Sequence, residues 1–238
     1  RITTSNADVF LITVLQSQER PEIRLIAAEA LALYDNDKST QALIGALTDT
    51  SPSVRFEAIK SLEDRQAQEA VVVAAVEYAK KETWKRGLSH AYRLIATSDH
   101  GPSIDYLYEN LSGQDARRAG MAVTAISKAR KNVRPEPLEA MVRDDNLDER
   151  MRQQAIQALA WADDAASESF LVEVLRNRVT YPENLQAASA RAMGRRKTPQ
   201  TLRGTSSGKL SKETGGKESS AMGSLFSRLW GRCPTTAW

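Results

Sequence analysis

Cysteine and aromatic residues are scarce in this chain of 238 residues. Cys233 is the only cysteine, so neither an internal disulfide nor a cysteine-based zinc site can form within one chain. Phe, Trp and Tyr make up only 6% of the sequence, so the core must consist of Ala, Leu, Ile and Val. Such a core suits thin layers of helices better than a β-sandwich or barrel. No run of about 18 apolar residues is present, so a transmembrane segment is not expected.

The charges are divided unevenly along the chain. Residues 1–194 contain 24 Lys plus Arg and 28 Asp plus Glu, whereas residues 195–238 contain 9 and 2. The basic character of the protein therefore belongs to its C-terminal part. Because non-specific nucleic-acid affinity comes from clustered Lys and Arg, a protein or peptide is the favoured partner of residues 1–194. Nucleic acid is the second choice.

A short pattern recurs six times in the first 194 residues. Each copy has an apolar residue, a usually basic position, and small or aliphatic residues three, four, six and seven positions later. The usually basic position is occupied by Arg24, Arg55, Lys85, Ala119, Arg152 and Gln186, which follow one another at intervals of 30 to 34 residues. Tandem units of this length are typical of solenoids, in which each unit packs only on its neighbours.

The pattern predicts that every repeat is a helical hairpin. Its apolar positions form one face of a helix, and a second amphipathic stretch precedes each copy. First helices are expected near 8–17, 39–48, 68–82, 103–112, 136–143 and 167–178, and second helices near 21–33, 52–63, 83–96, 115–129, 149–162 and 183–194. Pro21, Pro52 and Pro182 fit the starts of second helices, where a missing N–H costs nothing. The predicted fold is an all-α solenoid of about six hairpins, wound as a right-handed superhelix.

The hairpin at 40–62 carries a family resemblance. With Leu-Ile-Gly-Ala-Leu at 43–47, followed by Asp49, Pro52, Arg55 and Ala58, it resembles a HEAT repeat of the short kind also found in phycobilin lyase subunits. The resemblance implies an armadillo-like array whose second helices line a concave face. In such families this face usually docks a protein, and less often nucleic acid or a chromophore-bearing subunit. An accessory subunit of a lyase-type chromophore attachment system is therefore a third alternative.

The sequence predicts no catalysis and no metal or other cofactor. The di-iron HEAT enzymes that hydroxylate deoxyhypusine have His-Glu pairs, but neither His90 nor His100 is followed by glutamate. Alkylpurine DNA glycosylases with HEAT-like arrays use Trp, Asp and Arg. Trp161, Asp163 and Arg152 supply these residue types, but they match neither the order nor the spacing. No Ser/His/Asp or Cys/His set and no phosphate-binding glycine-rich loop suggests itself.

Acidic residues just before the usually basic position suggest a structural ladder between repeats. A carboxylate in the turn between two helices can accept hydrogen bonds from the first-turn backbone and from the guanidinium of the next layer. The expected members of this ladder are Arg24, Asp49, Arg55, Asp148 and Arg152.

Basic residues are dense in the third and fourth repeats. If stacking brings them to one edge, they form a surface for an anionic partner, although a solvated helix face is the simpler interpretation. Trp161 follows the fifth copy of the pattern and belongs to a residue type enriched in binding hot spots. The candidate partner-binding residues are Lys85, Arg86, Arg93, Arg117, Arg118 and Trp161.

The pattern stops after residue 194, which divides the chain into a repeat array (1–194) and a basic, Gly/Ser-rich linker (195–238). The linker composition predicts flexibility. Near its end, apolar residues within Leu225–Trp230 form a short amphipathic segment that could dock on the last hairpin, enter a partner's groove or adsorb weakly to an acidic membrane. The sequence begins at Arg1 with neither an initiator Met nor a signal-like stretch, so we expect a processed or trimmed N-terminus and a cytoplasmic location.

Overall fold

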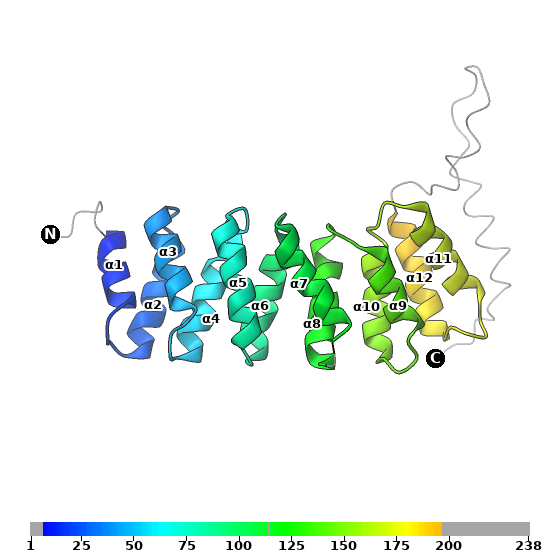
Figure 1. The fold of residues 1–238 in the computed structure, drawn as a ribbon, viewed down its shortest axis with the longest axis horizontal. Coiled ribbons are helices and arrows are strands. Elements are labelled where there is room, and N and C mark those ends of the chain that lie inside the picture. Colours follow the sequence, from blue (N-terminus) through cyan, green and yellow to red (C-terminus); the bar gives the residue numbers. More distant parts are fainter. Residues whose placement is uncertain (1–6, 114, 197–238) are drawn as a thin grey trace, which may run out of the picture. The chain divides into compact units, whose positions relative to one another are not determined.

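Twelve α-helices account for almost all regular structure in the part of the chain that the structure describes. This computed structural model describes residues 7–113 and 115–196, and contains no β-strand there (Figure 1). The hairpins are α1 (Ala7–Leu15) with α2 (Pro21–Leu31), α3 (Asp37–Ala46) with α4 (Pro52–Ser61), α5 (Glu69–Lys81) with α6 (Lys85–Thr97), α7 (Gly101–Leu111) with α8 (Ala116–Ala129), α9 (Pro135–Arg143) with α10 (Glu149–Leu159), and α11 (Ala165–Arg176) with α12 (Glu183–Arg195). A short 3-10 helix, Glu63–Arg65, follows α4.

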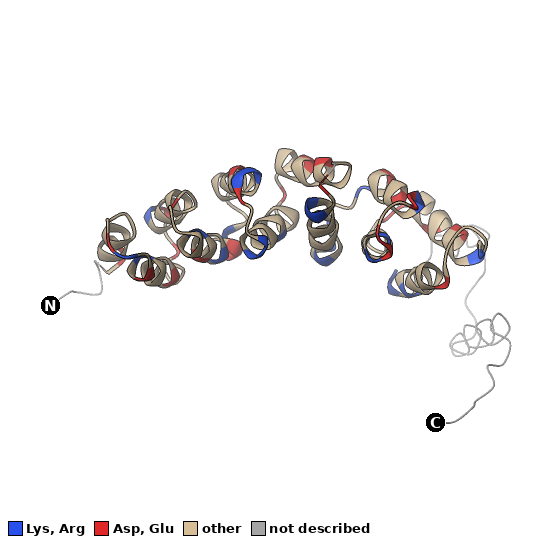
Figure 2. Cartoon of the chain, turned by 90° about the horizontal axis from the view of Figure 1, so that it is seen from below, with Lys and Arg blue, Asp and Glu red and all other residues tan. Residues whose placement is uncertain are grey.

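The hairpins stack in chain order. Each second helix packs on the second helix of the next hairpin, from α2 on α4 to α10 on α12, and the first helices do the same from α1 to α11. The result is two layers of helices, seen nearly end-on in Figure 2. The predicted all-α solenoid of six hairpins is confirmed. The predicted linker with its segment Leu225–Trp230 lies outside the described residues, apart from its first two positions.

Small residues allow the second helices to approach closely. Ala27, Ala58 and Ala155 occupy the same position of the repeat, and none of them has exposed surface. Beside them, Leu62 and Leu159 are also fully buried and fill the space between the layers. Full burial of a leucine contributes about 1.5–3 kcal/mol, so the core of each joint is small but densely packed.

The starts of the second helices place the side chains considered below. Pro21 and Pro52 are the first residues of their helices, as predicted, whereas Pro182 precedes α12 as its N-cap residue. The carboxylate of Asp115 accepts hydrogen bonds from the backbone N–H groups of Arg117 and Arg118 in the first turn of α8. Asp148 accepts one such bond, from Arg150 in the first turn of α10. Such caps fix where a helix begins, so they also fix which side chains its first turn presents.

Candidate binding groove and the joints between repeats

An ion pair joins the first two repeats. Arg24, on α2, meets Asp49, in the turn between α3 and α4, through two parallel hydrogen bonds of 2.8 Å each. The same carboxylate accepts a bond of 2.7 Å from the backbone N–H of Ser51, at the start of α4. Asp49 therefore anchors the start of its own second helix and holds the helix of the preceding repeat.

The next joint repeats this arrangement with a different acid. Arg55 Nε lies 2.9 Å from Glu82 Oε2, and Glu82 accepts backbone bonds from Thr83 and Trp84 at the start of α6. Each carboxylate thus meets the guanidinium of the preceding repeat, whereas the sequence suggested that of the next layer. The reason is directional: Arg24 in α2 and Arg55 in α4 each extend toward the turn of the following hairpin.

Arg152 forms a different set of contacts from the one expected. Its Nη1 lies 2.8 Å from Asp145, and its Nε donates to the carbonyl of Val142 at the end of α9. Asp148, the expected partner, instead accepts a bond of 2.6 Å from the backbone N–H of Arg150 and caps α10. Arg152 is 5% exposed, so it is a structural residue that links α10 to the turn before it.

The two joint carboxyl groups have lowered pKa values. Burial alone would raise the pKa of Asp49, but the hydrogen bonds from Arg24 and from the Ser51 backbone outweigh it. Burial likewise opposes the lowering at Glu82, where the bond from Arg55 and two backbone bonds prevail. Both carboxyl groups therefore stabilise the folded array most in their ionised form.

We expect the Asp49→Asn variant to be about 1 kcal/mol less stable than wild type at pH 7. Because the pKa of Asp49 is lower in the folded than in the unfolded state, its contribution is present above the unfolded value of about 3.9. It is lost as the pH falls through the folded value. Urea unfolding between pH 7 and pH 2 should show the gap closing with acidity, and a gap of constant size would contradict the role of this ion pair.

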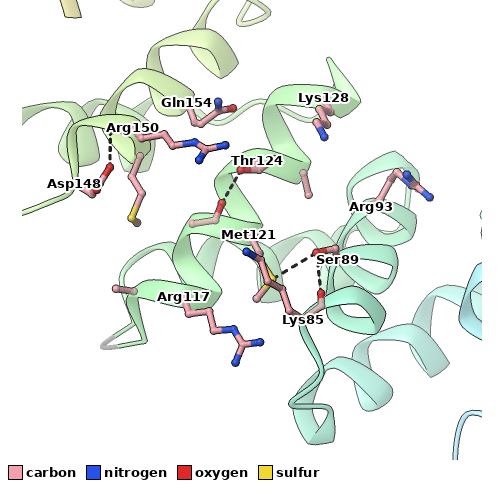
Figure 3. Close-up of a pocket in the computed structure, with 14 residues that line it drawn as sticks. Lys85, Ser89, Arg93, Arg117, Met121, Thr124, Lys128, Asp148, Arg150 and Gln154 are labelled. Carbon is pink, nitrogen blue, oxygen red and sulfur yellow. Dashed lines mark hydrogen bonds between the residues drawn. The ribbon is translucent and has the colours of Figure 1, made fainter. Parts of the chain in front are cut away.

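A groove of about 500 Å³ crosses the second-helix layer (Figure 3). Side chains from the three successive helices α6, α8 and α10 line it. Five of the lining residues are basic: Lys85, Arg93, Arg117, Lys128 and Arg150. The groove therefore gathers positive charge from three repeats at one place, although residues 1–194 as a whole carry more acidic than basic residues.

Most of these cations have no partner within the described part of the chain. Arg93 pairs with Glu63, with 3.0 Å between Nε and Oε1. The side chains of the other four, Lys85, Arg117, Lys128 and Arg150, make neither a hydrogen bond nor an ion pair with any described residue. All four are exposed. They remain available to a molecule that enters the groove.

Small and sulfur-containing side chains form much of the rest of the groove. Met121 on α8 and Met151 on α10 line it together with Gly120. A Cβ atom added to Gly120 would lie 3.7 Å from Cγ and Sδ of Met151, which is an ordinary contact. Ser89 Oγ lies 3.6 Å from Sδ of Met121. The cations thus surround an apolar strip.

The structure places three of the six candidate partner-binding residues in this groove, Lys85, Arg93 and Arg117. Arg118 instead donates to the carbonyls of Ala79, at 2.7 Å, and Glu82, at 3.0 Å, where α5 ends. It therefore holds the fourth repeat against the third. Arg86 lies over the ring of Phe56, 5.4 Å from its centre.

Trp161 also takes part in a contact within the array. The guanidinium of Arg130, which follows α8, lies 4.8 Å from the centre of the Trp161 ring. The tryptophan is partly buried and packs against the core. This cation–π contact joins the fourth and fifth repeats, and Trp161 is not among the residues that line the groove.

Sequence reasoning did not select Arg150 or the two methionines. A signal for Arg150 exists, because Arg117 and Arg150 both stand two residues before the position that defines the repeat. Met121 and Met151 could not be recognised in this way, since methionine at helical spacing is common in cores.

The described residues offer neither a cluster of metal ligands nor a membrane-spanning helix. No group of three or more His, Cys, Asp or Glu residues in residues 7–113 and 115–196 could hold a metal ion. In the same ranges, no helix has the length and apolar character needed to cross a membrane.

Residues 9–89 match the family model of HEAT repeats. This segment, from α1 into α6, is therefore similar to HEAT repeats. The groove extends from the end of this HEAT segment into α8 and α10. No relative was found among curated proteins.

Solved structures with a similar arrangement of helices include other repeat proteins. An engineered protein matches with a TM-score of 0.50 and 19% identity, over 80% of this chain and 96% of its own. Human deoxyhypusine hydroxylase in complex with glycerol matches with a TM-score of 0.45 and 18% identity, over 81% of this chain and 74% of its own. A designed armadillo repeat protein in complex with the peptide (KR)4 matches with a TM-score of 0.48 and 16% identity, over 79% of this chain and 98% of its own. The first match supports the HEAT-like solenoid fold, and at this identity it concerns the fold alone. HEAT and armadillo-like repeats are commonly scaffolds for protein interaction.

Proposed function

We propose that this HEAT-repeat array is a noncatalytic scaffold that binds a partner protein along its second-helix face, at the groove formed by α6, α8 and α10. The observation that carries the proposal is the convergence of four unpartnered cations from three repeats on one groove. A stacked array holds these side chains on rigid helices, so little conformational entropy is lost when a partner binds.

The chemistry of the groove favours binding over catalysis. Its lining residues include no histidine and no cysteine, and their only carboxylate, that of Asp148, already caps α10. General acid–base catalysis needs a titratable group that can reach the substrate's proton. The groove instead offers fixed positive charges, which attract and orient an anionic partner.

The same cations support nucleic-acid binding as a second candidate function. Lys and Arg side chains bind phosphates and release counterions, which makes the affinity fall steeply with salt. Titration of the full chain with duplex DNA at low salt separates the two candidates. Absence of binding under these conditions would remove the nucleic-acid function.

We expect a photo-crosslinker at Thr124, in the groove, to capture a discrete partner protein in the cells that produce this chain. A crosslinker at Ala166, on the exposed side of α11 in the other layer, is the matched control and should not capture the same partner. Combining the Thr124 probe with Lys85→Glu, Arg117→Glu and Arg150→Glu should lower the yield about tenfold, since three exposed ion pairs of about 0.5 kcal/mol each would be lost. Equal capture of the partner by both crosslinkers, or a crosslinking yield that the three substitutions leave unchanged, would contradict the proposal.

A further inference from the structure

We propose that the partner segment in the groove is an extended acidic peptide with carboxylates about three residues apart. This inference rests on the proposed function and adds the chemistry of the ligand. Three features of the groove support it: the positions of three cations in their helices, the spacing of the helices, and the apolar strip between the charges.

Three of the cations lie at helix starts, where a further positive charge is unfavourable unless a negative group pairs with it. Lys85, Arg117 and Arg150 lie in the first turns of α6, α8 and α10. The N-terminal end of a helix carries partial positive charge, so acidic residues there stabilise the helix and basic ones oppose it. No acidic residue lies in the first turn of α6 or α8. Carboxylates of the chain itself already bind the backbone N–H groups at these helix starts, from Glu82, Asp115 and Asp148. None of them pairs with the side chain of Lys85, Arg117 or Arg150, so a bound carboxylate could pair with these cations directly.

The spacing of these cations suits an extended chain that crosses the repeats. The helices α6, α8 and α10 pack directly on one another, and packed helices lie about 8–10 Å apart. A polyproline II segment rises about 3.1 Å per residue with three residues per turn. Side chains on one of its faces therefore recur about every 9 Å. One carboxylate in every three residues can then meet one cation in each repeat.

The apolar strip explains why a peptide fits better than a chain of phosphates. Met121 and Met151 lie among the cations, and methionine adapts its shape to apolar side chains of different kinds. A peptide can place an aliphatic residue there between its acidic residues. Single-stranded nucleic acid would instead be expected to stack its bases on aromatic rings, and the lining of the groove includes none.

Fluorescence anisotropy with labelled nonapeptides tests the proposal on the full chain. One probe has the pattern Glu-Pro-Leu repeated three times. A second has the same composition with its three glutamates adjacent, and a third has lysine in place of glutamate. We expect the first to bind at least tenfold more tightly than the other two. A dT oligonucleotide of nine residues represents the phosphate alternative and should bind more weakly than the first peptide.

Two triple variants locate the binding site. Lys85→Glu with Arg117→Glu and Arg150→Glu should weaken binding of the first peptide at least tenfold. The control variant replaces Lys38, Lys81 and Arg176, which are exposed on first helices, with glutamate. It changes the net charge by the same amount and should alter the affinity for the first peptide less than twofold. The groove variant should also have a thermal midpoint no lower than wild type, because it places acidic residues at helix N-termini.

The results distinguish this inference from the proposed function. Equal affinity for the two glutamate peptides, tighter binding of the oligonucleotide, or affinity unchanged in the groove variant would overturn the acidic-peptide ligand. A lower thermal midpoint of the groove variant would show that the three cations stabilise the array, and would overturn it as well. If the Thr124 crosslink still captures a partner in these cases, the scaffold function stands with a different ligand.

Discussion

Replacing Arg65 with alanine is expected to lower the free energy of unfolding by about 3–5 kcal/mol. Arg65 belongs to the 3-10 helix after α4 and is only 6% exposed. Its guanidinium donates to Thr40 Oγ1 at 2.7 Å and to the carbonyls of Leu31, at 3.1 Å, and Tyr34, at 2.7 Å. These carbonyls lie at the C-terminal end of α2 and just after it, where partial negative charge favours a cation. Arg65 therefore holds the first repeat to the second.

Urea unfolding at pH 7 measures this loss, with Arg178→Ala as the control. Arg178 is exposed in the loop after α11, and such a surface substitution should change stability by no more than about 0.5 kcal/mol. Arg65→Lys keeps the charge but loses the fork of donors, so its stability should lie between wild type and Arg65→Ala. An Arg65→Ala variant as stable as Arg178→Ala would contradict the role of Arg65 as a joint between repeats.

The Gly87→Ala substitution is expected to destabilise the array by about 1–3 kcal/mol, as overpacked sites do. A destabilising effect is unusual for this substitution, because alanine in a helix interior is normally about 1 kcal/mol more favourable than glycine. Gly87 lies inside α6, and a Cβ there would come 2.1 Å from the hydroxyl oxygen and 3.2 Å from Cζ of Tyr78. The tyrosine, on α5, is 5% exposed and has little room to move away.

A second substitution at Tyr78 tests the cause of this effect. The Tyr78 hydroxyl is buried near the Glu82 carboxylate but makes no well-formed hydrogen bond in the described structure, so Tyr78→Phe should be neutral or slightly stabilising. In the Tyr78→Phe background, Gly87→Ala should cost less than in wild type, because the closest atom is gone. Additive effects in this double-mutant cycle would show that the two residues do not clash. Thermal unfolding of the four proteins provides the measurement.

The fold followed from the sequence because its determinants are local and repeated. The positions of Ala58 and Ala155 in the pattern, and prolines such as Pro52, were sufficient to place the helices within a few residues. The contacts between repeats were harder to predict from the sequence. Arg65 and Gly87 depend on atoms 25 to 34 and 9 residues away, and no short pattern encodes which carbonyl or ring they will meet.

The residues of the candidate groove could be predicted from the sequence only in part, for a related reason. Lys85, Arg93 and Arg117 were selected because basic residues are dense in that region. Density alone could not show that Arg118 would turn toward the end of α5 while Arg117, beside it, remained without a partner. Adjacent residues on a helix point about 100° apart, so the packing of neighbouring repeats decides which of them reaches the groove.

Methyl NMR of the methionines tests the central claim, that the second-helix groove is the binding surface. Met121 and Met151 line the groove, whereas Met141 is buried in α9 and Met193 lies on α12. On addition of the Glu-Pro-Leu nonapeptide, we expect the methyl signals of Met121 and Met151 to shift with saturation while those of Met141 and Met193 stay in place. Saturable binding that leaves Met121 and Met151 unshifted would contradict the account.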